Sequence, residues 1–117
     1  LATRADAVFV AEDADELLGY LMILLPRWTD AAEVSDLAVH RPARRRGAGR
    51  ALIDGAAAWA RERELRALWV EPQGDAGEAI EFYLRLGFRV AGFNDRWNSN
   101  RDDEDGRQTV YLYLELS

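Results

Sequence analysis

The sequence predicts an α/β fold in which helices pack on a mixed β-sheet. An opening pair of apolar, strand-like runs flanks an acidic turn, as in a hairpin. After that pair, strand-like and helix-like segments alternate along the chain, a pattern typical of a sheet with helices on its faces. No repeat or linker divides the 117 residues. We therefore predict a single domain covering residues 1–117.

Short apolar runs bounded by turn residues predict six strands. Pro26 closes the second run, and the acidic segment Glu12–Glu16 separates it from the first. The predicted strands are Val8–Ala11, Leu17–Leu25, Glu33–Val39, Leu65–Glu71, Phe88–Phe93 and Thr109–Leu116.

Two segments carry apolar residues at helical spacing. The first runs from Ala48 to about Glu64, and the second from about Ala76 to Leu86. Gly87 follows the second segment directly, where a glycine commonly ends a helix. Both segments are therefore predicted to be amphipathic helices.

The composition excludes several kinds of chemistry. The chain has no cysteine, one histidine (His40), and fifteen basic residues that are all arginine. Thiolate metal sites, a lysine Schiff base and the lysine of a Walker A loop are thereby excluded. A single histidine disfavours a histidine-based metal site, and we expect no metal. No apolar run is long enough to span a bilayer and no signal peptide is visible. A cytoplasmic protein without a membrane partner is expected.

The charge is unevenly distributed. Residues 41–50 carry five arginines and no acid, whereas the other 107 residues hold ten arginines and twenty-one acids, a net charge of −11. An acidic body is a poor match for a nucleic acid, which favours a broad basic face. We therefore expect no nucleic-acid partner, although RNA binding through the arginine turn stays open as an alternative. The pattern favours one small anionic ligand at the arginines and a cationic partner elsewhere.

The run Arg44-Arg45-Arg46-Gly47-Ala48-Gly49 lies between a predicted strand and a predicted helix. Its glycines allow a sharp turn, and the first N–H groups of the helix lack intrahelical partners. Such a helix start binds anions, and the arginines add positive charge. A phosphorylated cofactor is predicted here. A dinucleotide-binding fingerprint is less consistent with this run, because it requires a third glycine where Leu52 stands.

Together with a second motif, these residues resemble the GNAT superfamily of acyl-CoA N-acyltransferases. The strand Leu37-Ala38-Val39 precedes the arginine-glycine turn, and the segment Ala79–Phe88, with the sequence AIEFYLRLGF, follows in the expected order. The match covers about residues 7–93 and is weakly closest to aminoglycoside 3-N-acetyltransferases. It implies a mostly antiparallel central sheet.

The resemblance implies that acetyl-CoA is the co-substrate. Backbone groups of Leu37, Ala38 and Val39 would pair with the pantetheine arm in the manner of an extra strand. The pyrophosphate would lie at the helix start. The residues assigned to it are Arg44, Arg45, Arg46, Gly47, Ala48, Gly49 and Arg50.

The resemblance also assigns three catalytic candidates. Tyr83 matches a tyrosine that protonates the departing CoA thiolate, and a phenol can do so because its ordinary pKa of about 10 exceeds that of a thiol. Glu33 and Asp36 match acids that deprotonate the amine, and the choice between them stays open. On a regular strand they point to opposite faces, but a bulge near Leu37, as the family has, would change that. Tyr83 as an ordinary core aromatic is the alternative.

The implied function is direct transfer of an acetyl group from acetyl-CoA to a primary amine. The alternative is a non-catalytic acyl-CoA-binding sensor or interaction module. We expect the chain to lack the strand and two helices that open most family members, and the asparagine common before the second helix is replaced near Asp75 and Ala76. The sequence does not fix the oligomeric state, but an exposed closing strand often pairs into dimers in this family, so a homodimer stays open.

Overall fold

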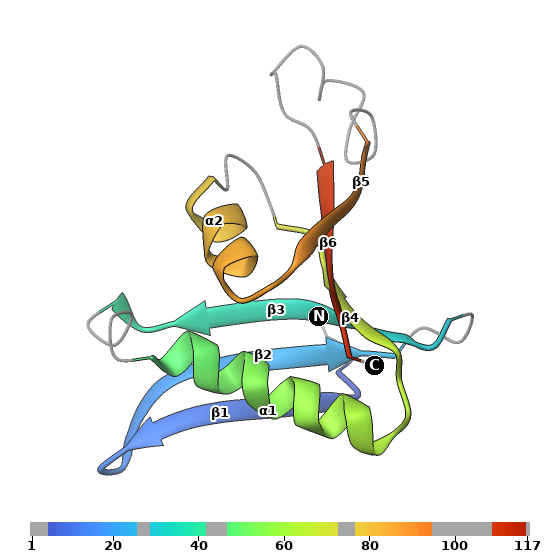
Figure 1. The fold of residues 1–117 in the computed structure, drawn as a ribbon. Coiled ribbons are helices and arrows are strands. Elements are labelled where there is room, and N and C mark those ends of the chain that lie inside the picture. The colour runs from blue at the N-terminus through green and yellow to red at the C-terminus, as the bar shows by residue number, and fades with distance from the viewer. Residues whose placement is uncertain (1–4, 26–28, 42–46, 73–76, 95–108, 117) are drawn as a thin grey trace. The chain divides into compact units, whose positions relative to one another are not determined.

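The computed structural model describes residues 5–25, 29–41, 47–72, 77–94 and 109–116 (Figure 1). Within these residues the predicted six strands and two helices are present, and their ends lie within two residues of the predicted ones. The elements are β1 (Ala7–Asp13), β2 (Glu16–Leu24), β3 (Ala31–Val39), α1 (Ala48–Glu62), β4 (Ala67–Val70), α2 (Gly77–Arg85), β5 (Arg89–Asn94) and β6 (Thr109–Glu115).

The strands form one six-stranded sheet in the order β1-β2-β3-β4-β6-β5. The pairs β1–β2, β2–β3 and β5–β6 are antiparallel. The neighbours β3 and β4 are connected through α1, a helical crossover of the kind that joins parallel strands. The mixed, mostly antiparallel sheet with helices is thereby confirmed.

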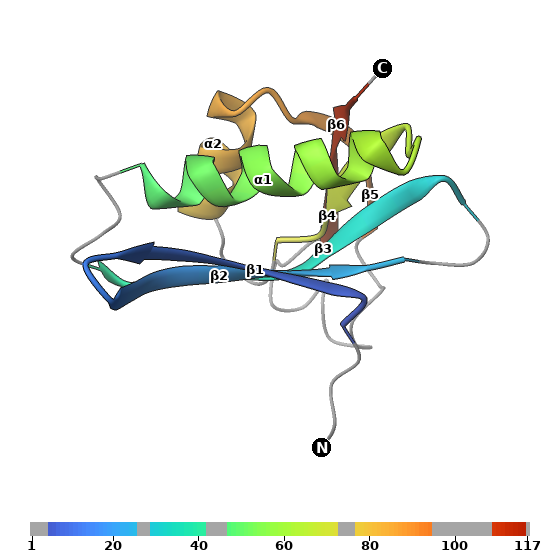
Figure 2. The same ribbon diagram turned by 90° about the horizontal axis from the view of Figure 1, so that it is seen from below.

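The chain divides into two compact units, which are described separately. The first contains Leu1–Leu68 with Leu116–Ser117, and the second contains Trp69–Glu115. In the first unit, α1 lies along one face of the β1–β2–β3 sheet (Figure 2). The buried side of α1 carries small and aliphatic side chains, while Trp59 at its edge meets Phe9 of β1 edge-on at 6.0 Å between ring centroids. The buried aliphatic residues of α1 are Ala48, Leu52, Ile53, Ala56, Ala57 and Ala60.

The second unit is built on the β5–β6 pair and on aromatic contacts. Leu112 of β6 is fully buried, and Trp69 lies 6.2 Å from Tyr111 between ring centroids. The ring of Tyr83 in α2 contacts the ring of Phe88, which is 2 % exposed and directly precedes β5. These contacts hold α2 and the start of β5 together.

The two helices end in the same hydrogen-bonded motif but with different residues. At the end of α1, the N–H of Glu64 donates to the carbonyl of Arg61, and the N–H of Leu65 donates to that of Ala60. After α2, Gly87 and Phe88 donate in the same pattern. The motif requires a left-handed residue, which is Glu64 (φ +60°) in the first case and Gly87 (φ +100°) in the second. Because Glu64 is not a glycine, the sequence predicted α1 to continue to it, whereas the helix ends at Glu62.

Glu64→Gly is expected to stabilise the protein by about 0.5–1 kcal/mol. A left-handed L-residue costs about 1–2 kcal/mol, and the larger chain entropy of glycine in the unfolded state offsets part of that relief. The free energy of unfolding from chemical denaturation measures the effect. Glu62→Gly is the matched control, because it places glycine at the last helical residue instead of the left-handed one and should destabilise by up to about 1 kcal/mol. Destabilisation by both variants would contradict the role given to Glu64.

Candidate active site

The start of α1 has the geometry of an anion-binding site. Gly47 adopts the left-handed conformation (φ +80°, ψ +11°), and its carbonyl accepts the N–H of Ala51 at 3.0 Å. The N–H groups of Ala48, Gly49 and Arg50 precede that first helical bond, so no carbonyl within the helix is available to them. No described side chain caps the helix, and its first turn carries no acid. This end of α1 therefore keeps the positive field that favours an anion.

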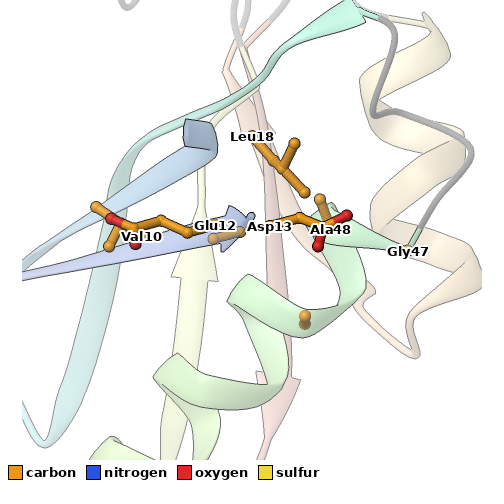
Figure 3. Close-up of a pocket in the computed structure, with 8 residues that line it drawn as sticks. Val10, Glu12, Asp13, Leu18, Gly47 and Ala48 are labelled. Carbon is orange, nitrogen blue, oxygen red and sulfur yellow. The ribbon is translucent and has the colours of Figure 1, made fainter. Parts of the chain in front are cut away.

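A hollow of about 440 Å³ lies between the start of α1 and the tip of the β1–β2 hairpin (Figure 3). Two of its residues, Glu12 and Asp13, are acids at the hairpin tip. Carboxylates compete with a phosphate for the field of a helix start, so this side of the helix does not suit a phosphate by itself. The sequence showed an acidic turn here, but not that the turn lies next to Gly47 and Ala48. The hollow is lined by Val10, Ala11, Glu12, Asp13, Leu18, Gly47, Ala48 and Ala51.

The predicted pantetheine strand is the last part of β3. Leu37, Ala38 and Val39 pair with Leu21, Tyr20 and Gly19 of β2. The two strands approach closely at Gly19, where an added Cβ would lie 2.6 Å from the carbonyl oxygen of Ala38. Position 19 therefore has to be glycine for β2 and β3 to keep this spacing.

A β-bulge places both candidate acids on one face of β3. Ile23 pairs with Val34 and the preceding Met22 pairs with Asp36, so Ser35 is the extra residue in the ladder. Glu33 pairs with Leu24, which shares a face of β2 with Met22. Glu33 and Asp36 therefore point to the same side of the sheet. A bulge was expected near Leu37, and the structure has it two residues earlier.

That face lies opposite α1, because Ile23 and Val34 are buried on the helix side. Glu33 is half-buried and Asp36 is exposed. Along β2, the partners of the two acids are two residues apart, which is about 7 Å in a strand. Both carboxylates can therefore serve one small site.

Asp36 has an aromatic partner that the sequence reasoning missed. The phenol of Tyr20 on β2 donates a hydrogen bond of 2.9 Å to Oδ2 of Asp36. The carboxylate raises the pKa of the Tyr20 phenol above its ordinary value, mainly through this hydrogen bond and also through its negative charge. The direct partner of Asp36 on β2 is Met22, and Tyr20 lies two residues from it on the same strand. The contact between Tyr20 and Asp36 is therefore diagonal, and it cannot be predicted without the strand register.

Tyr83 lies on α2, in the second unit. Its side chain is 6 % exposed, with the rings of Phe82 and Phe88 at centroid distances of 5.2 and 5.1 Å. This packing is what a core aromatic has, and a catalytic phenol on the same helix would have it as well. Its proton-donor role stays a prediction.

Arg44, Arg45 and Arg46 lie outside the described residues. Within the described part of the chain, no group of three or more potential metal ligands is found. In the same ranges, no helix is both long and apolar enough to cross a membrane.

Residues 1–88 match the model of the acetyltransferase (GNAT) family. Among curated proteins, the chain is 32 % identical over 107 residues to a streptothricin acetyltransferase of Streptomyces lavendulae, a match that covers 91 % of this chain and 56 % of that protein. The chain thus spans little more than half the length of this relative.

Solved structures show the same fold. A nourseothricin acetyltransferase is 31 % identical with a TM-score of 0.81, over 94 % of this chain and 65 % of the other. A Bacillus anthracis protein assigned as a streptothricin acetyltransferase, solved in complex with acetyl coenzyme A, is 24 % identical with a TM-score of 0.83, over 98 % of this chain and 65 % of the other.

Gly19→Ala is expected to destabilise the protein by about 1–3 kcal/mol, because the new methyl group would overlap the backbone of Ala38 and separate β2 from β3. Denaturant unfolding measures the loss. Gly92→Ala is the matched control in β5, where an added Cβ meets no atom within 4 Å. Equal effects of the two variants would show that the close approach at Gly19 is unimportant.

Tyr20 is expected to ionise above the ordinary phenol pKa of about 10. Because its pKa is raised in the folded state, the linked stabilisation is complete below that ordinary value and is lost as the pH rises through the raised one. NMR of ring-labelled tyrosine follows the titration. Asp36→Asn should let Tyr20 ionise at lower pH, and Tyr113→Phe should not. An unchanged Tyr20 titration in Asp36→Asn would contradict the hydrogen bond.

Proposed function

Because the chain belongs to the acetyltransferase (GNAT) family, we propose that it is an acetyl-CoA-dependent N-acetyltransferase that acts on a primary amine of a small molecule or peptide. The observation that carries this proposal is the start of α1, where a left-handed glycine follows the cofactor strand and leaves the first helical N–H groups to an anion. The acetyl-CoA complex of the Bacillus anthracis protein supports the same co-substrate.

In this proposal the described segments divide the cofactor between them. The backbone of Leu37–Val39 pairs with the pantetheine arm, and the N–H groups of Gly47–Arg50 bind the pyrophosphate. The side chains of Arg44–Arg46 supply further positive charge. The acids of the hairpin tip favour binding of the pyrophosphate on the part of the helix start that faces away from Glu12 and Asp13.

The transfer itself is direct. An acid of β3, Glu33 or Asp36, takes a proton from the acceptor ammonium, directly or through water. The amine nitrogen then attacks the thioester carbonyl, and an N–H near Val39 stabilises the oxyanion. The new C–N bond forms as the C–S bond breaks, and Tyr83 donates its proton to the CoA thiolate. The proton lost by the attacking nitrogen returns through water to the tyrosinate.

Streptothricin is the first acceptor to test, because relatives in Streptomyces lavendulae and Escherichia coli are streptothricin acetyltransferases. The acidic body of the chain is suited to a cationic acceptor of this kind.

The proposal includes a cytoplasmic location, where acetyl-CoA is available, and no nucleic-acid or membrane partner. The sequence left open a homodimer through the closing strand. That strand, β6, lies between β4 and β5 in the sheet order, so both of its edges are already paired within the sheet. A homodimer would have to use a different surface.

Calorimetric titration with acetyl-CoA, followed by thiol release in the presence of streptothricin, tests the proposed function. We expect one-to-one binding of acetyl-CoA, no binding of a nicotinamide dinucleotide, and turnover with the amine. Tyr83→Phe should lower kcat by about 10²-fold or more, because a positioned acid contributes on that scale. Its affinity for acetyl-CoA should stay within about twofold, since the variant removes only the hydroxyl.

Tyr113→Phe is the matched control, because it removes a hydroxyl from a half-buried tyrosine of β6 in the same unit. Its kcat should equal that of the unmodified chain. Binding of acetyl-CoA without thiol release from any amine would support the non-catalytic acyl-CoA-binding module instead. Absence of binding would contradict both functions.

A further inference from the structure

The two acids of β3 share a face but differ in their surroundings. Asp36 is exposed and held by the phenol of Tyr20, whereas Glu33 is half-buried and lies one row further along the β2–β3 ladder. The exposed carboxylate of Asp36, held by Tyr20, and the half-buried carboxylate of Glu33 therefore offer an amine two different environments. The structure thus helps to distinguish the roles of Glu33 and Asp36, either of which could take the proton of the amine on the basis of the sequence.

The hydrogen bond from Tyr20 restricts what Asp36 can do. It occupies a lone pair of Oδ2 and fixes the plane of the carboxylate, while Oδ1 and the remaining lone pairs still accept N–H donors. Such a carboxylate binds a cation in a defined position. Asp36 is therefore suited to hold an ammonium group, which leaves Glu33 as the candidate acid of β3 that removes the proton.

The neighbourhood of the pair is apolar and open. On the strand β1, next to Tyr20 and Met22, Val8 and Val10 are 54 % and 56 % exposed. Apolar side chains beside a fixed carboxylate suit the aliphatic part of an amine, whose charged end would meet Asp36.

We propose that Tyr20 is a positioning residue that fixes Asp36 as the anchor of the acceptor ammonium, and that Glu33 is the acid that accepts the proton. This inference rests on the proposed function and extends it to the division of work between the two carboxylates. Tyr20 acts only through Asp36, so its loss weakens acceptor binding and leaves the chemical step and the acetyl-CoA site unchanged.

Steady-state kinetics with streptothricin separate these roles. Tyr20→Phe should raise the KM for streptothricin about three- to tenfold with kcat within twofold, and Asp36→Asn should raise it at least tenfold. Glu33→Gln should lower kcat about 10²-fold, as expected for loss of a general base. The double variant Tyr20→Phe/Asp36→Asn should match Asp36→Asn alone, because Tyr20 acts through that carboxylate. The KM for acetyl-CoA should not change in Tyr20→Phe.

Binding of streptothricin in the absence of acetyl-CoA, measured by calorimetry, tests the anchor without turnover. We expect the Kd to rise in Tyr20→Phe and Asp36→Asn and to stay the same in Tyr113→Phe. Such a result would support the anchor even if no thiol were released, so failure of the acetyltransferase activity is distinguishable from failure of this inference. Equal Kd values in all variants, no binding to the unmodified chain, or a fall in kcat instead of a rise in KM for Tyr20→Phe would each overturn it.

Discussion

The register between β2 and β3 is the constraint on which the candidate site depends. Val34 and Leu37 have opposite parity in the chain, so a regular strand cannot turn both towards α1. The bulge at Ser35 resolves this conflict, because it lets Val34 pair with buried Ile23 and Leu37 pair with buried Leu21. Burial of apolar side chains on the helix side thereby sends the acids of β3 to the opposite side. The position of the acids is a consequence of packing.

A second irregularity connects the sheet to the start of α1. Ala11 pairs with Gly19 and Glu12 pairs with Leu17, so Leu18 is the extra residue of β2. Leu18 is 7 % exposed and forms a cluster with Ala48 in the first turn of the helix, against which Ala11 and Val39 pack. The end of β3, which is the proposed pantetheine strand, and the proposed pyrophosphate site are thus held by one apolar cluster. The close approach of β2 and β3 at Gly19 lies beside it.

The charged side chains of the first unit lie in separate regions. The hairpin tip brings Glu12 and Asp13 to one side of the helix start. The outer face of β3 carries Glu33 and the Asp36–Tyr20 pair. In the proposed function an anionic cofactor and a cationic acceptor require opposite fields, which separate regions of one small unit can supply. Residues 41–50 carry five arginines and no acid, whereas the rest of the chain is net negative.

The sequence by itself determined the elements, their order and the family, because apolar periodicity, glycines and prolines act over a few residues. Through the family resemblance it also predicted a site made of Tyr83, Glu33, Asp36, the end of β3 and the start of α1. Only the tertiary structure decided where the bulge lies, that Tyr20 binds Asp36, and that the acidic hairpin tip adjoins Gly47. The switch in apolar parity between Val34 and Leu37 was a readable signal for the bulge. The hydrogen bond of Tyr20 to Asp36 and the position of the hairpin tip beside Gly47 depend on contacts between distant segments. Strand register and helix packing create such contacts, and local sequence patterns do not contain them.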